Sequence, residues 1–596
     1  MPLFRRQSVS KRSKSAIEKQ YSTDAKSQHK RQTKKRIAII GSGVSGLTCA
    51  HYLSQPQLAK RYEVTVFEAG DYIGGHVNTI DIELQDGKKA KTKYLEKSAI
   101  DTGFIVFNER TYPNFFRLLH DLQVPFQATD MSFSVKNIAR NFEYNGHTLN
   151  TLLSQRRNAL NPKFWQFIKD ILRFNKHIKQ LRQDFEQARA SGNDTSVFTE
   201  QTLGSYLISQ NYHPLFTDNY LLPMVSAIWS TGLDDVQDFP LVFFAQFFDN
   251  HGLLDVVNRP QWFTIKGGSK QYVNKLVTRF VKAGGTVRVN HPVQSVVRED
   301  NQVIVKVANR TMVADKANDN LQELIFDEVI FACHADTALS LLQDASDDET
   351  QVLSNFQFTN NTAVLHTDTS VLPKKPLAWA SWNYLINDKL DKKLAQKNGQ
   401  TESKHSYQTA KPVLTYHMNI LQRLTKAHNY LVTLNPATLN TPTPNNSIDD
   451  AQIIKSIDYS HPIFDKQMVA AQHDWAKISG TGLHTHFCGA YWFNGFHEDG
   501  VRSGLRVCQA LGSTIDIKDD VDPSHLPDSK AAHTPFRYKD LPIKADKNLR
   551  KLNKRQIVTA TTNQELVNYI ATLQSRSRSD NSKTKRSWFG RRKVKN

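Results

Sequence analysis

The stretch that decides the fold is Arg36-Ile-Ala-Ile-Ile-Gly-Ser-Gly-Val-Ser-Gly46. The apolar, β-branched run at 36–40 is ended by a glycine, which is typical of a buried strand in a parallel sheet. Residues 42–54 then predict a helix, and Glu63-Val-Thr-Val-Phe-Glu68 predicts the next strand. A strand, a helix and a second strand in this order form one βαβ unit, so we expect an α/β fold.

The glycines between the first strand and the helix have the spacing of a dinucleotide-binding loop. Gly41 permits the tight turn, Gly43 lets the backbone approach a pyrophosphate at the helix N-terminus, and Gly46 permits close packing of the helix on the strand. Glu68, 22 residues after Gly46, is placed to accept hydrogen bonds from an adenosine ribose. A glycine-rich turn without a ligand is the alternative. The candidate contacts in the loop are Gly41, Ser42, Gly43, Ser45 and Gly46.

The positive charge of the chain is concentrated at its two ends. The net charge is +20, but residues 1–36 carry twelve Lys or Arg against two acids, and residues 575–596 carry nine against one. The ends account for +10 and +8, which leaves about +2 for the body. A basic groove across the folded part is therefore not indicated, and we expect no nucleic-acid partner. The tails are either solvated and disordered or attached to an anionic membrane surface, and nucleic-acid contact is the least favoured interpretation.

The four cysteines are scattered, without the spacing of a zinc site or a disulfide framework. They therefore favour a reducing cytoplasm. No stretch approaches the roughly 18 to 20 apolar residues of a membrane span, and the N-terminus lacks the apolar core of a secretory signal. We expect a cytoplasmic protein that is soluble or peripheral on the inner face of the plasma membrane.

The residues after Glu68 read Ala69-Gly-Asp-Tyr-Ile-Gly-Gly-His76 and resemble the flavin amine oxidase superfamily. In that superfamily a Gly-Gly pair, here Gly74 and Gly75, lets the chain pass close to the pyrophosphate of FAD. Members usually carry arginine after the pair, whereas His76 stands here, so charge pairing with the phosphate is in doubt. The resemblance spans residues 35–512 and implies that the cofactor is FAD.

Further segments share this resemblance. The turn Asp101-Thr102-Gly103 resembles the one that passes the flavin, and Val293 begins a strand like the one whose valine contacts adenine through its backbone. The segment Thr264-Ile-Lys-Gly-Gly-Ser269 resembles the Gly-Gly turn ahead of the helix that feeds this strand.

The stretch from Phe487 to Gly504 resembles the last cofactor-binding segment of such flavoproteins. There a late strand ends in glycine, here Gly489, and the next helix begins beside the isoalloxazine ring. The positive end of that helix would stabilise negative charge on the reduced ring. The resemblance implies that Glu498 or Asp499 holds the ribityl chain or a phosphate-linked water, with Ser503 in the same segment.

We therefore expect a Rossmann-type FAD-binding domain of amine oxidase topology, interleaved with an α+β substrate domain. Strands are predicted at 286–289, 294–298, 303–307 and 328–332, helices at 152–189, and a capping box at 562–565. The expected units are a disordered basic tail at 1–34; FAD-binding segments at 35–110, 263–340 and 481–512; substrate-domain segments at 111–262, mainly helical, and 341–480, with polar loops; and a linker, short helix and basic tail at 513–596.

The catalytic residues are not evident, because a flavin can take a hydride from a well-positioned C–H bond with little help. His497, His76 and Tyr491 are weak candidates, and each is as easily explained by packing or a hydrogen bond. Tyr491, Trp492 and Phe493 could frame a substrate as the aromatic pair of amine oxidases does, and Lys266 could contact a water near the flavin.

The stretches Asp101-Thr-Gly-Phe-Ile-Val-Phe-Asn-Glu-Arg-Thr-Tyr-Pro113 and His497-Glu-Asp-Gly500 look most like a bacterial subgroup of predicted NAD- or FAD-binding proteins. Members of that subgroup tend to be encoded beside cyclopropane-fatty-acyl synthase-like methyltransferases. This association implies a lipid or other small hydrophobic substrate, dehydrogenated or isomerised by an FAD oxidoreductase. An amine oxidase proper and a non-redox, membrane-associated FAD scaffold are the alternatives. The substrate, the electron acceptor, the flavin linkage and the oligomeric state stay open.

Overall fold

The computed structural model of the chain describes residues 34–85, 95–229, 233–255, 260–310, 321–386, 413–425, 428–436, 448–480, 482, 484–518 and 557–573. Residues 1–33 of the predicted tail, the predicted polar loop at 387–411, most of the one at 435–449 and the basic end at 575–596 lie outside these ranges. Within the described ranges no helix is both long and apolar enough to cross a membrane.

A parallel five-stranded sheet confirms the predicted α/β fold. β1 (Lys35–Ile40) pairs in parallel with β2 (Tyr62–Phe67) on one side and with β14 (Glu328–Phe331) on the other. β10 (Thr286–Arg288) and β20 (Thr485–Phe487) are the edges, so the order is β10-β2-β1-β14-β20. The apolar run of β1 is buried because both faces of the sheet are covered.

Helices α2 (Val44–Leu53), α12 (Lys270–Lys282) and α19 (His497–Ala510) pack together against this sheet. Glycine sets how closely α19 approaches α2, because a Cβ at Gly504 would lie 2.7 Å from the Ser45 carbonyl oxygen. α3 (Pro113–Asp121) packs on the first turn of α19. This packing brings the first and the last part of the predicted FAD-binding domain side by side.

A three-stranded meander separates β10 from β14; its first two strands fall where strands were predicted, at 294–298 and 303–307, and its third strand was not predicted. It comprises β11 (Val293–Glu299), β12 (Gln302–Ala308) and β13 (Leu321–Phe326), all antiparallel. After β14 the chain continues through α13 (Ala335–Leu341) and α14 (Asp347–Leu353).

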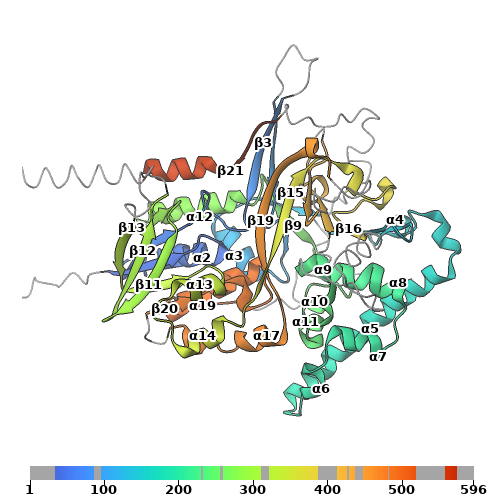
Figure 1. Cartoon of the computed structure of the whole chain (residues 1–596), viewed down its shortest axis with the longest axis horizontal. Helices are drawn as coiled ribbons and strands as arrows, with labels where there is room; N and C mark the ends of the chain where they lie inside the picture. Colours follow the sequence, from blue (N-terminus) through green and yellow to red (C-terminus); the bar gives the residue numbers. More distant parts are fainter. Residues whose placement is uncertain are drawn as a thin grey trace, which may run out of the picture.

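A second, seven-stranded sheet lies beside the parallel one (Figure 1), in the order β19-β15-β18-β17-β16-β7-β8. Its strands are β7 (Phe133–Asn137), β8 (Phe142–Asn145), β15 (Phe358–His366), β16 (Trp382–Ile386), β17 (Val413–His417), β18 (Leu431–Leu434) and β19 (Ile453–Pro462). α16 (Met418–Leu421), α17 (Lys466–Gln472) and α18 (Trp475–Ile478) are its short helices. A separate small sheet is formed by β5 (Phe107–Asn108), β9 (Trp262–Ile265) and β6 (Phe126–Thr129), in that order.

A helical insert projects from the far side of the second sheet (Figure 1). The predicted helical spacing at 152–189 corresponds to its longest helix, α5 (Pro162–Ala190). The other elements are α4 (Leu149–Leu152), a 3-10 helix at Arg156–Leu160, α6 (Ser196–Thr199), α7 (Leu203–Ser209), α8 (Pro214–Phe216), a π-helical turn at Thr217–Leu221, α9 (Leu222–Trp229), α10 (Leu233–Gln237) and α11 (Leu241–Asn250).

The region predicted as a linker after residue 512 contains a strand, which corrects the sequence prediction. β21 (Ile557–Thr562) pairs antiparallel with β3 (Thr79–Gln85), whose other neighbour is β4 (Leu95–Asp101). Thr562 therefore ends a strand instead of capping a helix, and helical residues begin at 564. Leu566 and Ile570 of this helix are buried against the Rossmann core. The prediction failed because the partner strand β3 is far away in the sequence.

Candidate cofactor and substrate site

The loop between β1 and α2 forms one end of a cavity of about 990 Å³. Gly41 has a φ of +109°, and a Cβ there would lie 2.8 Å from the Ala332 carbonyl oxygen. A Cβ at Gly46 would lie 2.2 Å from the Gly41 carbonyl oxygen, whereas a Cβ at Gly43 would meet nothing within 4 Å. Gly41 and Gly46 are thus required by packing, and Gly43 borders open space where a ligand can approach the backbone.

Glu68 follows β2 and lines the same cavity. Its carboxylate accepts hydrogen bonds from the Ser42 backbone N–H at 3.1 Å, the Ser42 hydroxyl at 2.5 Å and the Gly70 N–H at 2.8 Å. The acid therefore stands beside the glycine loop, at the carboxyl end of the parallel strands. Ligands of open α/β sheets bind at this end.

The Gly-Gly pair and the 101–103 turn meet the loop, although they are separate in the sequence. A Cβ at Gly75 would lie 3.2 Å from the Gly43 Cα, and one at Gly103 would lie 2.2 Å from the His76 carbonyl oxygen. The Thr102 hydroxyl donates to the Asn78 carbonyl at 2.8 Å, which fixes the turn. Of the predicted cofactor residues, the cavity is lined by Gly41, Ser42, Gly43, Ser45, Glu68, Gly74, Gly75, His76, Thr102, Gly103, Val293 and Gly489.

His76 lies in a cluster of neutral histidines. Its ring stacks on Tyr459 with centroids 4.9 Å apart, and His461 lies 5.4 Å away. Burial lowers the pKa of His76 to about 3 and that of His461 to about 4. His76 Nε2 is a buried atom without a hydrogen-bond partner among the described residues. The histidine that replaces the usual arginine thus provides a neutral ring with an unused nitrogen.

Four predicted cofactor residues are not among the residues that line the cavity, and their contact with FAD stays a prediction. Gly46 packs closely against the β1 side of the loop, so its surroundings leave no space even for a Cβ. The Ser503 hydroxyl accepts the Gly489 N–H at 3.0 Å. Asp499 accepts the Phe496 N–H at 2.8 Å at the start of α19. These residues hold the backbone around the cavity in place and do not border it.

Glu498, the fourth, instead caps α3. Its carboxylate accepts the Asn114 side-chain N–H at 2.6 Å and the backbone N–H groups of Asn114 and Phe115 at 3.1 and 2.8 Å. Burial raises the pKa of Glu498 to about 8. The Glu498 carboxylate therefore caps the N-terminus of α3. The sequence gives no sign that α3 lies next to Glu498.

The three catalytic candidates all line the cavity. His497 is held by the Tyr272 hydroxyl at 2.7 Å from its Nε2 and stacks on Phe104 with centroids 3.7 Å apart. Burial keeps the pKa of His497 well below its usual range, so the ring is neutral. Tyr491 packs edge-on against Phe356. These contacts favour positioning roles over proton transfer for His497.

The aromatic cage formed by Tyr491, Trp492 and Phe493 is not present, because only Tyr491 reaches the cavity. Trp492 is 1% exposed within the core. Lys266 also lies away from the cavity wall and is exposed, so it does not serve as a lysine near the flavin.

Beyond the glycine loop the cavity continues between the second sheet and the helical insert. Its apolar wall is formed by Phe104, Ile105, Val106, Met131, Phe133, Tyr220, Met224, Ile228, Phe247, Leu253, Trp262, Trp382, Leu434 and Phe496. The sequence missed most of these positions because they come from distant elements. His334 also lines the cavity, and its place just after β14 is a signal that could have identified it.

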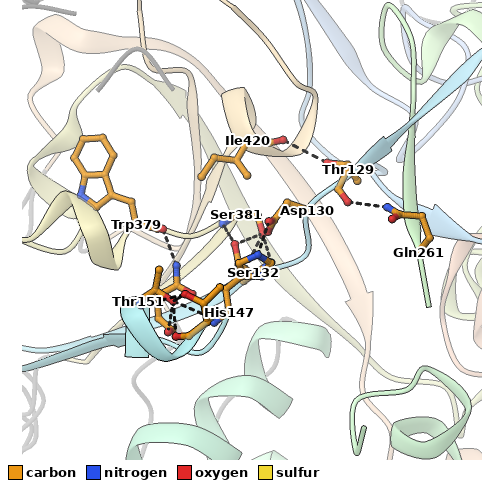
Figure 2. Close-up of polar contacts among 11 residues, drawn as sticks. Thr129, Asp130, Ser132, His147, Thr151, Gln261, Trp379, Ser381 and Ile420 are labelled. Carbon is orange, nitrogen blue, oxygen red and sulfur yellow. Dashed lines mark hydrogen bonds and ion pairs between the residues drawn. The ribbon is translucent and has the colours of Figure 1, made fainter. Parts of the chain in front are cut away.

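Two polar residues face each other in the cavity wall. Asp130 Oδ2 lies 3.4 Å from His147 Nε2, and Asp130 Oδ1 is buried without a hydrogen-bond partner among the described residues. Figure 2 shows Ser132 and Ser381 beside Asp130, with His147 on the neighbouring segment. The Ser132 N–H donates to the Ser381 hydroxyl at 2.7 Å, which holds the strand that follows Asp130.

Comparisons with known proteins agree with this geometry. The family described as flavin containing amine oxidoreductase matches residues 44–394. A fatty acid isomerase from P. acnes has a TM-score of 0.51 at 13% identity, over 80% of this chain and 98% of its own. A putrescine oxidase variant scores 0.52 at 12% identity, over 80% and 99%. The cyclohexylamine oxidase of Brevibacterium oxydans scores 0.50 at 14%, over 80% and 98%.

No curated protein matches the sequence. The low identities to the solved structures show the shared fold, and the family match covers more than half of the chain. The expected enzyme class and the expected cofactor, FAD, are confirmed by this match. The chain belongs to the flavin-containing amine oxidoreductase family and is an FAD-dependent oxidoreductase.

Proposed function

We propose that the chain dehydrogenates or isomerises a hydrophobic substrate, an acyl chain, at the point where its cavity meets the FAD site. The observation that carries the proposal is the continuity of one cavity, from the glycine loop to an extended apolar wall. The shared fold does not choose between substrates, because it carries both a fatty acid isomerase and amine oxidases. The choice rests on this chain's own lining residues.

The cavity residues around the glycine loop fit a dinucleotide. The open space over Gly43 and the free N–H groups at the start of α2 suit a pyrophosphate. Glu68 would hold the ribose, and His76 would offer its unused Nε2 as a neutral hydrogen-bonding group. FAD bound there supplies an acceptor for a hydride from a substrate C–H bond.

In this proposal the apolar wall binds the acyl chain and excludes water. Met224, Ile228 and Phe247 come from the helical insert, and Phe133 and Trp382 come from the second sheet. Burial of an acyl chain against them gains about 0.8 kcal/mol for each CH₂ group. The nearby histidines His76 and His497 are neutral, so they do not favour a charged group at this depth.

Anaerobic reduction of the purified holoenzyme tests the proposal. Bleaching of the flavin absorbance by free fatty acids or phospholipids, or formation of a shifted double bond, is expected, and primary amines should leave the spectrum unchanged. A Met224→Gln variant should retain FAD and lose about tenfold in the lipid reaction, because it places a polar group in the wall. Ile208→Gln, at an exposed position of α7, is the matched control. No reaction with any lipid would refute the proposal.

One observation favours an amine oxidase proper as the second candidate. The partly buried Asp130 carboxylate in the cavity wall could pair with an ammonium group. In that case primary or secondary amines would bleach the flavin and yield peroxide in air, and Asp130→Asn would raise the KM for the amine.

A further inference from the structure

We propose that the part of the helical insert at 146–169 is a docking surface for an anionic lipid bilayer. It is independent of the basic tails, and the proposal does not depend on the identity of the substrate. This surface, called the insert patch below, comprises the apolar side chains Leu149, Leu160 and Trp165 and the basic side chains Arg156, Arg157, Lys163 and Lys169.

The apolar members of the insert patch are among the most exposed large hydrophobic side chains of the described residues. Leu149 is 66% exposed, Leu160 89% and Trp165 44%. Leu160 and Trp165 lie near each other, because the Trp165 indole N–H donates to the carbonyl of Ala159, the residue before Leu160, at 2.9 Å. Large apolar side chains exposed near one another, as Leu160 and Trp165 are, mark a contact surface.

All charged side chains of the insert patch are basic. Between Glu143 and Asp170 the sequence contains four Lys or Arg and no acidic residue. Arg156 is held beside α4 by its hydrogen bond to the Asn150 side chain at 2.7 Å, which places a cation next to Leu149. The two flanking acids are turned inward, with Glu143 3% and Asp170 1% exposed.

More cations border the insert patch from another part of the chain. The Glu143 carboxylate accepts the backbone N–H groups of Lys374 and Lys375 at 3.0 and 3.3 Å, so these exposed lysines stand beside β8. Basic side chains around exposed leucine and tryptophan are the composition of an interfacial anchor. Each cation near an anionic bilayer adds about 1 kcal/mol. This composition is complementary to anionic headgroups over acyl chains.

The insert patch adjoins an opening of the cavity. Gly146 and His147 line the cavity and are exposed, and Leu149 follows them closely in the chain. Figure 2 shows His147 close to Thr151 of α4. Docking of the insert patch would place the cavity entrance at the headgroup level, where a hydrophobic substrate could enter without crossing water.

Vesicle binding by the full chain tests the proposal. The vesicles contain equal parts of phosphatidylcholine and phosphatidylglycerol, and all proteins compared keep both basic tails, so a difference between variants reports the insert patch. The double variant Leu149→Ser/Leu160→Ser should bind about tenfold more weakly, because it removes two apolar side chains from the bilayer. The matched control is Val197→Ser/Ile208→Ser, whose positions are 77% and 75% exposed on α6 and α7. The control should bind like the wild type, and all variants should keep their Tm.

A second readout locates the contact. Lipids brominated on their acyl chains should quench part of the tryptophan fluorescence, and Trp165→Phe should remove that part. Equal vesicle binding by both double variants, or quenching unchanged in Trp165→Phe, would overturn the proposal. So would a dimer in sedimentation velocity that Leu149→Ser/Leu160→Ser dissociates without any change in vesicle binding, because the occupant would then be a second copy of the chain.

Discussion

Gly43 is the N-cap of α2 and Gly46 lies in the first turn of that helix, and an added methyl group meets opposite surroundings at the two positions. At Gly43 it would meet no atom within 4 Å. The backbone there has φ −66° and ψ 177°, which alanine adopts without strain. The free energy of unfolding of Gly43→Ala without cofactor should therefore stay within about 0.5 kcal/mol of the wild type.

The same methyl group would project into the space assigned to the pyrophosphate. Loss of one hydrogen bond to a charged group costs about 1.5 to 3 kcal/mol. The Kd for FAD should therefore rise about 10- to 100-fold. The measurement is a titration of the flavin-free protein with FAD, followed by quenching of flavin fluorescence, with Tm measured in parallel.

Gly46→Ala is the control for the loop. Its methyl group would lie 2.2 Å from the Gly41 carbonyl oxygen and 3.0 Å from the Ala332 Cβ. Backbone atoms cannot yield easily, so this variant should lose about 3 kcal/mol or more of stability. If Gly43→Ala binds FAD within twofold of the wild type, the phosphates do not approach this backbone and the reasoning is refuted.

Three further predictions concern residues outside the cofactor contacts. Asp101 is fully buried and accepts the Ser269 N–H at 2.9 Å and hydroxyl at 2.7 Å. Burial raises the pKa of Asp101 to about 6, so the folded state binds its proton more tightly than the unfolded state. As the pH rises from about 4 to about 6, the free energy of unfolding of the wild type should fall by about 2 kcal/mol relative to that of Asp101→Asn. The same difference between the urea midpoints of the two proteins at both pH values would contradict this. Glu498→Gln should lower the Tm through the weakened cap of α3 while FAD affinity is kept; loss of FAD affinity at constant Tm would restore the sequence-based role of Glu498. Leu566→Ala should cost about 2 to 4 kcal/mol, because this side chain is 4% exposed in the Rossmann core, and an unchanged midpoint of chemical denaturation would argue that the 557–573 segment is not docked.

The cofactor loop could be predicted because its signals are local. Gly41, Gly43 and Gly46 have fixed spacing within one turn, and Glu68 follows at the end of the next strand. The resemblance extended this to Gly74, Gly75 and Gly103, all of which the structure brings to the same cavity. Local backbone geometry is dictated by residues close in sequence, so a sequence can reveal it.

The role of an ionisable side chain could not be predicted in the same way. Glu498 and His497 are adjacent in the sequence, yet one caps α3 and the other lines the cavity. Which way each points depends on α3 and Tyr272, which come from segments more than two hundred residues away. The wall between the second sheet and the insert depends on contacts among several such distant segments.

By itself the sequence determined the parallel strand, the glycine loop and the helix that follows it, because these depend on apolar periodicity and on conformations that only glycine adopts. The tertiary structure alone decided that Ile557–Thr562 pairs with β3, that Glu498 caps α3, and that Leu149, Leu160 and Trp165 stay exposed. Pairing and burial are set by which surfaces meet in space, and a pattern along one segment does not contain its partner.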